Sequence, residues 1–201
     1  MTVWYNDNVK RERGDSMIKV LPGTTIEISE LTKGVSRRLF DGIFAAGGIT
    51  LSQVSVMTGL EPYMIQNWVK RGFVSSPIKR QYSKDQFSRI VTLNMLRESL
   101  QLDKICDMLS YVNGVLNDES DNIINDSELY HKYVDLVAES QGGIITDKDT
   151  IAKAVESAVI EYEEPFPGAK HRVIKVLQIM AYAHFASISR RSAEEILAKL
   201  K

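Results

Sequence analysis

The sequence predicts a mainly α-helical protein, and three observations support this prediction. Apolar residues recur at intervals of three and four along much of the 201-residue chain, which is the spacing of one helix face. Thr50 and Ser83 are each followed three residues later by a glutamine, a pair that caps the start of a helix. Glycines follow the periodic segments, where helices end, at Gly47-Gly48, Gly59, Gly72, Gly114 and Gly142-Gly143.

The composition excludes several classes of protein. Hydrophobic residues make up 44% of the chain and charged residues 25%, as in globular rather than disordered proteins. No apolar run approaches about 18 residues, so we expect no membrane-spanning helix and no membrane partner. The first residues are too polar for a signal peptide, and the single Cys106 permits neither a disulfide nor a multi-thiolate metal site. Together these features predict a cytoplasmic protein.

The net charge of −1 hides an uneven distribution of charge. Residues 49–98 carry seven Lys/Arg against three Asp/Glu, whereas residues 99–164 carry four against fifteen. Such polarity suits a protein that presents one face to phosphate groups. An acidic helical region that is simply well solvated explains the second segment equally well.

The segment from residue 49 to 72 predicts two short helices joined by a tight turn. Thr50 begins the first helix, Gly59 makes the turn, and Pro62 suits the first position of the second helix. Ile65, Trp68 and Val69 fix the inner face of that second helix by their spacing. Its opposite face then carries side chains able to contact base edges or phosphates in a major groove, namely Tyr63, Gln66, Asn67 and Lys70. An ordinary exposed helix face has a similar composition, so both interpretations stay open.

A small basic hairpin is predicted after this helix, which ends at Arg71-Gly72. Phe73-Val74 would form one strand and residues 78–82 the returning strand, with Lys79 and Arg80 exposed on it. Basic residues beside a recognition helix can hold flanking phosphates, which predicts a winged helix-turn-helix over residues 34–114 that binds double-stranded DNA. Arg71 and Lys84 complete the set of expected DNA contacts. Arg89 is expected on the outside of the following helix.

Residues 1–33 and 115–201 flank this predicted domain. The first segment is interpreted as an N-terminal arm, and the second as a C-terminal helical domain with helices over 127–140, 148–162 and 170–188. The 170–188 helix is apolar nearly all round, so it is either central to the core or part of a homodimer interface. Ser192 is predicted to cap a further, final helix. The acidic run at 117–126 lacks the glycine and glutamate of a calcium-binding loop and is interpreted as solvated, so no metal or cofactor is predicted.

Two resemblances rest on these residues. The segment TLSQVSVMTGLEPYMIQNWVKRGFV, followed by KRQYSKDQFSRI, resembles the DNA-binding domain of MerR-type regulators. Gly72-Phe73, Arg80 and Tyr82 match that family's helix-to-wing step, wing arginine and wing tyrosine, whereas Gln66 and Val69 stand where the family has arginine and glutamate. Over about residues 30–140 the chain is also similar to the bacterial domain-of-unknown-function family 1836, whose members are regarded as MerR-like regulators without an agreed ligand.

These observations lead to three hypotheses about function. The first is a transcriptional regulator that binds double-stranded DNA as a homodimer. The second is a protein-interaction module that keeps the helix-turn-helix fold without specific DNA binding. The third is a sensor of an unknown small-molecule effector in the C-terminal domain. No glycine-rich phosphate loop, HExxH or GxSxG motif occurs in the sequence, so an enzyme is not expected.

Overall fold

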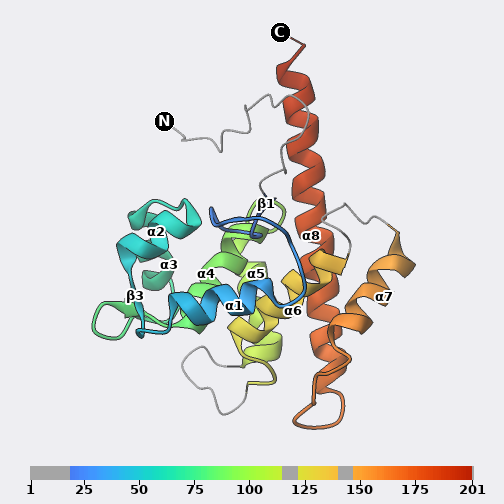
Figure 1. The fold of residues 1–201 in the computed structure, drawn as a ribbon, viewed down its shortest axis with the longest axis horizontal. Helices are drawn as coiled ribbons and strands as arrows, with labels where there is room; N and C mark the ends of the chain where they lie inside the picture. Colours follow the sequence, from blue (N-terminus) through green and yellow to red (C-terminus); the bar gives the residue numbers. More distant parts are fainter. Residues whose placement is uncertain (1–18, 115–121, 140–146, 201) are drawn as a thin grey trace.

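A computed structural model describes residues 19–114, 122–139 and 147–200, and the fold over these residues is mainly helical (Figure 1). They form eight helices and four two-residue strands. The helices are α1 (Val35–Ile43), α2 (Leu51–Thr58), α3 (Pro62–Lys70), α4 (Lys84–Leu96), α5 (Leu102–Asn113), α6 (Asp126–Glu139), α7 (Lys148–Ala158) and α8 (Ala169–Ala198). The strands are β1 (Lys19–Val20), β2 (Glu27–Ile28), β3 (Ile49–Thr50) and β4 (Gln81–Tyr82).

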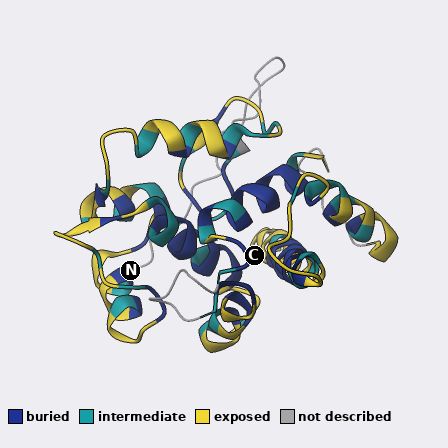
Figure 2. Cartoon of the chain, turned by 90° about the horizontal axis from the view of Figure 1, so that it is seen from below, coloured by how far each residue is buried: buried dark blue, intermediate teal, exposed yellow. Residues whose placement is uncertain are grey.

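Helix α4 is buried along most of its length. Figure 2 shows that the buried residues gather in the middle of the molecule. Helices α2, α5, α6 and α8 all pack against α4. Phe40 of α1 contacts Phe87 of α4 and stacks on Tyr130 of α6, with ring centroids 5.1 and 5.3 Å apart. The buried apolar side chains form one cluster, which includes residues of all three predicted segments, 1–33, 34–114 and 115–201.

Residues 19–33 form part of this packed body. Leu21 is fully buried, and the Tyr130 hydroxyl donates a hydrogen bond to the Pro22 carbonyl at 2.8 Å. The backbone N–H of Thr25 donates to the carbonyl of Met57 at the end of α2. At Gly34, which precedes α1, the backbone N–H donates to Asp135 of α6 at 2.7 Å. This segment therefore joins α2 to α6. The sequence also contains a small basic cluster at Lys10, Arg11 and Arg13, which lies outside the described residues.

The strands form two separate antiparallel pairs, β1 with β2 and β3 with β4. In the second pair Ile49 lies opposite Tyr82 and Thr50 opposite Gln81. The predicted pairing of Phe73-Val74 with residues 78–82 is therefore wrong. Phe73 and Val74 are instead buried as core residues, and the strand before α4 pairs with the strand before α2. A Cβ atom on Gly48 would come within 2.8 Å of the Gln81 Cβ, so this close strand pairing requires glycine.

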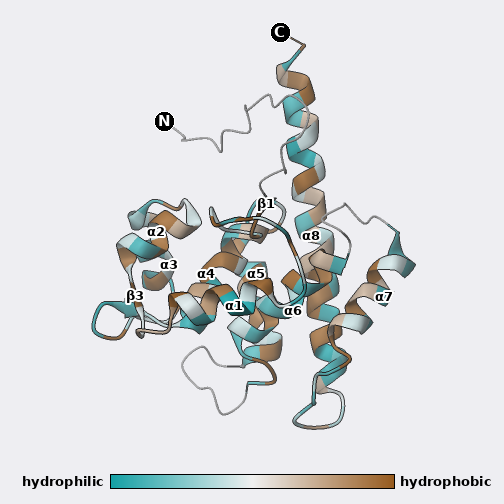
Figure 3. Cartoon of the chain, in the orientation of Figure 1, coloured by the Kyte–Doolittle hydropathy of each residue, from teal (hydrophilic) through white to brown (hydrophobic). Residues whose placement is uncertain are grey.

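Helix α8 runs without interruption through the position where a new helix was predicted to begin. Ser192 does not cap a helix start, because its hydroxyl bonds to the Ile188 carbonyl one turn earlier. Val173, Leu177 and Met180 are buried against the rest of the chain, so the apolar 170–188 segment contributes to the core. The end of α8 extends beyond the body (Figures 1 and 3). No helix within the described residues is both long and apolar enough to cross a membrane.

Candidate nucleic-acid interface

Helices α2 and α3 form a compact pair joined by a short turn. The α2 start has the predicted capping box, in which the Thr50 N–H donates to Gln53 Oε1 at 2.8 Å and the Gln53 N–H donates to Thr50 Oγ1 at 3.4 Å. At the other end the Gly59 N–H bonds to the Ser55 carbonyl, and the Ser55 hydroxyl donates to the Leu60 carbonyl at 2.6 Å. These local hydrogen bonds fix the direction in which α3 leaves the turn.

Helix α3 ends through its backbone. The Phe73 N–H donates to the Trp68 carbonyl and the Gly72 N–H to the Val69 carbonyl, which is the Schellman arrangement. Gly72 has φ of 75°, a left-handed conformation that favours glycine. Phe73 is thereby turned into the core and ends the helix at a fixed place.

The outward face of α3 is the face predicted from helical spacing. Ile65 and Trp68 are buried, at 0% and 3% exposed. The four side chains on the opposite side are exposed and form no hydrogen bond or ion pair with any described residue; they are Tyr63, Gln66, Asn67 and Lys70. A free polar face of this kind leaves every donor and acceptor available to a partner.

Lys79 and Arg80 form the tip of a tight turn in the loop of residues 75–80. Ile78 and Gln81 exchange two backbone hydrogen bonds, of 3.1 and 2.9 Å, across these two residues. Lys79 has φ of 49° and Arg80 has φ of 65°, and they are the two non-glycine residues with positive φ in the described chain. Such turns favour asparagine and glycine, because other side chains are strained there. The chain thus holds two exposed cations in a conformation that costs it free energy.

Gln86 holds this loop against the start of α4. Its Oε1 accepts the Ser83 N–H and completes the predicted capping box. Its Nε2 donates to the Ser75 carbonyl and hydroxyl and to the Ser76 carbonyl, at 2.9 to 3.1 Å. The sequence predicted only the capping role, since the loop contacts are made 10 and 11 residues away. One amide therefore fixes both a helix start and the base of the loop.

The two remaining predicted contacts are already paired within the chain. Arg71 lies 3.7 Å from Asp103 and places its guanidinium 4.3 Å above the Phe73 ring. Lys84 forms an ion pair with Asp41 at 3.0 Å. By contrast, Gln66, Lys70 and Arg80 converge on one cavity of about 490 Å³ between α3 and the loop, together with the apolar Leu51, Val69, Pro77 and Tyr82. Of the eight predicted residues, the structure groups these three around a common opening.

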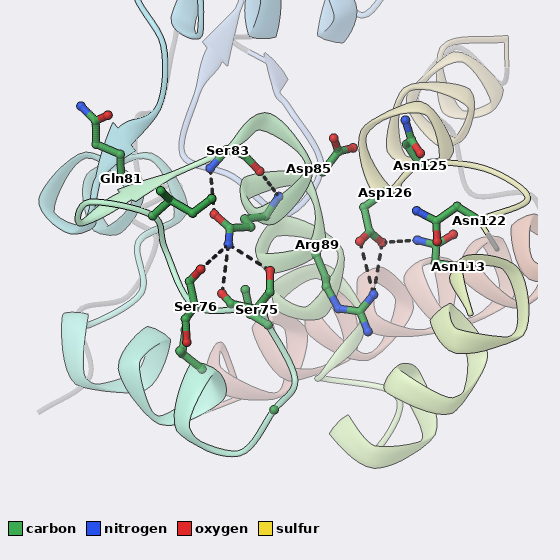
Figure 4. A pocket seen from close by; sticks show the side chains of 15 residues that line it. Ser75, Ser76, Gln81, Ser83, Asp85, Arg89, Asn113, Asn122, Asn125 and Asp126 are labelled. Carbon is green, nitrogen blue, oxygen red and sulfur yellow. Dashed lines mark hydrogen bonds and ion pairs between the residues drawn. The ribbon is translucent and has the colours of Figure 1, made fainter. Parts of the chain in front are cut away.

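Arg89 is buried, not exposed as predicted from the sequence (Figure 4). Its Nε donates to the Phe73 carbonyl at 2.7 Å, and its Nη1 lies 3.3 Å from Asp126 Oδ2. The Asn113 amide donates to the same carboxylate at 2.8 Å. Burial raises the pKa of Asp126 to about 6, although the Arg89 charge opposes this effect. This network ties the end of α3 to α4, α5 and α6.

A polar cavity of about 710 Å³ lies between this network and the loop (Figure 4). Ser75, Ser76 and Gln86 line one part of it, and Asn113 and Asp126 another. The buried Asn113 Oδ1 has no hydrogen-bond partner among the described residues. The volume lies within the range of small-molecule sites, about 300–1,000 Å³. The small-molecule effector considered from the sequence stays a prediction. No group of three His, Cys, Asp or Glu within the described ranges is arranged to hold a metal ion.

The described residues thus form a mainly helical protein in which α3 presents an exposed polar face beside a basic loop. Residues 48–133 match the family described as a domain of unknown function, DUF1836. The matched range runs from β3 to the middle of α6 and includes α3, the 75–80 loop and the Arg89 network. No curated protein matches the chain significantly, and neither does any solved structure.

Proposed function

We propose that this protein is a DNA-binding transcriptional regulator with a MerR-like winged helix-turn-helix. In this proposal α2 and α3 are the helix-turn-helix, α3 enters the major groove, and the 75–80 loop is the wing. The observation that carries the proposal is the exposed α3 face, where Gln66, Asn67 and Lys70 have no partner among the described residues. Glutamine and asparagine can bond both edge atoms of adenine, and lysine can reach guanine or phosphate.

The charges beside α3 support contact with the phosphate backbone. Residues 61–84 contain five basic residues and one acidic residue. Lys70, Lys79 and Arg80 are exposed, and none of them pairs with an acidic group among the described residues. Unpaired Lys and Arg side chains can neutralise phosphates and release the counterions of DNA without first breaking an internal ion pair. The strained turn adds support, since backbone strain is common at functional sites.

A second candidate is a protein-interaction module that keeps this fold without specific DNA binding. The observation that favours it is the 490 Å³ cavity, which is lined mainly by apolar side chains although it opens between three polar ones. A peptide with one apolar side chain and an acidic flank would fit such a site. The two candidates differ in whether the residues that line this cavity contact DNA or a peptide. Substitution of these residues therefore separates the two candidates.

The experiment that tests the proposal is selection of genomic DNA fragments by the purified protein, followed by gel retardation of the recovered sequences. We expect a shared sequence element, and we expect Asn67→Ala to change the preference between related sequences by about 1–3 kcal/mol at one base pair. Lys153→Ala on the exposed side of α7 is the control and should leave both unchanged. If no duplex is retained at low salt, DNA binding is refuted and the interaction module takes its place.

A further inference from the structure

The polar cavity of about 710 Å³ beside the 75–80 loop is built apart from the exposed α3 face (Figure 4). None of the four side chains of that face lines it. Its walls come from the end of α3, the loop, the first turns of α4, the last residue of α5 and the residues at the start of α6. All of these residues lie within 48–133, the range matched by the DUF1836 family, and α7 and α8 contribute none. The cavity is therefore distinct from a site in the C-terminal helices.

One wall of the cavity carries three asparagine side chains beside Asp126 (Figure 4). The Nδ2 of Asn113 donates to Asp126, which fixes the orientation of this amide, and the buried Oδ1 then has no donor among the described residues. The side chains of Asn122 and Asn125 form no hydrogen bond with any described residue. A buried acceptor without a donor costs free energy. This wall therefore offers hydrogen-bonding groups that the rest of the described chain leaves unused.

The part of the cavity beside the loop carries serine hydroxyls. Ser75 Oγ accepts from the Gln86 side-chain amide at 2.9 Å, and Ser83 Oγ accepts from the Gln86 backbone N–H at 3.2 Å. Neither hydroxyl donates to a described residue, so both hydrogens remain available to a ligand. Apolar surface is added by Val69, Val74 and Ile78. A molecule that fills the cavity would thus meet hydroxyl groups at one end and amide groups at the other.

The charges and free groups of the lining indicate the class of molecule that fits the cavity. The charged residues of the lining are Asp85, Asp126 and Arg89, whose formal charges sum to −1. Arg89 is already bound to the Phe73 carbonyl and to Asp126, so the described lining has no free cation to hold a phosphate or a carboxylate. An ammonium group donates hydrogen bonds but accepts none, so it would leave the amide and hydroxyl donors unpaired. A hydroxyl group both donates and accepts, and it therefore suits both ends of the cavity.

From these observations we infer that the cavity binds a neutral polyhydroxyl molecule of the size of a monosaccharide or a disaccharide. Its hydroxyl groups bond to the amides of Asn113, Asn122 and Asn125 at one end and to the hydroxyls of Ser75 and Ser83 at the other. Neighbouring hydroxyls match the paired oxygen and N–H groups of an asparagine amide. Because the ligand contacts the loop and the start of α6 together, its binding holds the 75–80 loop in place. This inference does not depend on DNA binding, and its test contains no DNA.

The first experiment is isothermal titration calorimetry of the full chain with neutral sugars. The probes are glucose, galactose, mannose, ribose, arabinose, maltose, lactose and sucrose, and the comparison compounds are 1,4-diaminobutane and inorganic phosphate. At least one sugar should bind with a dissociation constant below about 1 mM, and both comparison compounds should bind more weakly than that sugar. The inference is overturned if none of the sugars reaches this affinity, or if either comparison compound binds more tightly than every sugar.

Two asparagine substitutions locate the site. Asn122→Ala removes a free amide from the cavity and breaks no side-chain hydrogen bond within the described chain, so it should raise the dissociation constant of the strongest sugar about five- to tenfold. Asn67→Ala removes an equally free amide from the exposed α3 face and should leave that constant unchanged. In hydrogen exchange the sugar should slow the backbone amides of residues 75–81 and 122–126, and not those of α7. Equal effects of the two substitutions, or slowed exchange confined to other residues, would place the sugar elsewhere and overturn the inference.

Discussion

Replacing Lys79-Arg80 by Asn-Gly should separate stability from DNA binding. Asparagine and glycine are the residues that a turn with two positive φ angles favours, so Lys79→Asn/Arg80→Gly should keep the loop conformation. The substitutions relieve backbone strain at two positions, but glycine has more conformational freedom in the unfolded chain. The net increase in the free energy of unfolding is about 1 kcal/mol. For a chain of this size the melting temperature should rise by about 2–4 °C.

The loss of binding follows from the number of free cations. If Lys70, Lys79 and Arg80 each contact one phosphate, the logarithm of affinity falls with the logarithm of salt with a slope of about −2.7 per copy. A fourfold rise in salt then weakens wild-type binding about 40-fold. The double variant retains one free cation, so its slope is about −0.9 and the same rise costs about 3.5-fold.

Fluorescence anisotropy of a labelled duplex over a salt series measures both slopes, and differential scanning calorimetry measures the melting temperature. Lys153→Ala on α7 should have the wild-type slope. The reasoning about phosphate contacts is refuted if the double variant keeps the wild-type slope. The reasoning about the turn is refuted if its melting temperature falls by several degrees.

Three further predictions concern the interior. Gln86→Glu keeps the helix cap but removes the donors to the loop carbonyls; we expect about 1–3 kcal/mol of lost stability by urea denaturation and weaker retardation of DNA. Asp126→Ala leaves Arg89 buried without its carboxylate, which should cost about 3–5 kcal/mol, and a loss below about 1 kcal/mol would show that the pair is solvated. Burial lowers the pKa of His131 and of His184 to about 4. Between pH 6.5 and 4 the unfolded chain therefore binds more protons at these histidines than the folded chain, so the free energy of unfolding falls as the pH falls through this range. The raised pKa of Asp126 has the opposite sign between pH 6 and 4, so the net stability should fall by about 1.4 kcal/mol per pH unit there, and a flat pH profile would contradict these assignments.

Local signals in the sequence were enough to predict the helix pair and its faces. The capping boxes at Thr50 and Ser83, the turn at Gly59 and the burial of Ile65 and Trp68 are confirmed. Each depends on residues at most four or five positions apart, where helical spacing determines which groups meet. His184 on the apolar α8 is likewise a buried, hydrogen-bonded core residue, with a hydrogen bond of 2.5 Å to the Tyr133 hydroxyl.

The errors concern contacts between distant residues. Strands of two residues have no periodic signal, so the pairing of β3 with β4 across more than 30 residues was not predictable from local pattern. On an isolated α4, Arg89 would lie on the polar, solvent-facing side. In the folded chain α6 covers this position and supplies Asp126, which is 37 residues away in the sequence. Ser192 resembles an N-cap because a serine hydroxyl can accept from a backbone N–H later in the chain or donate to a carbonyl one turn earlier. Because α8 continues through this position, the hydroxyl donates to the Ile188 carbonyl.

The contacts of residues 19–34 also set an order for folding on the ribosome. The hydrogen bonds from Tyr130 to Pro22 and from Gly34 to Asp135 close loops of 108 and 101 residues. At synthesis rates of about 5–20 residues per second, the first described segment waits roughly 5–20 s before its partners in α6 emerge. During that time Leu21 and Phe40 lack much of their final covering, so a nascent chain stalled before α6 would expose apolar surface to chaperones.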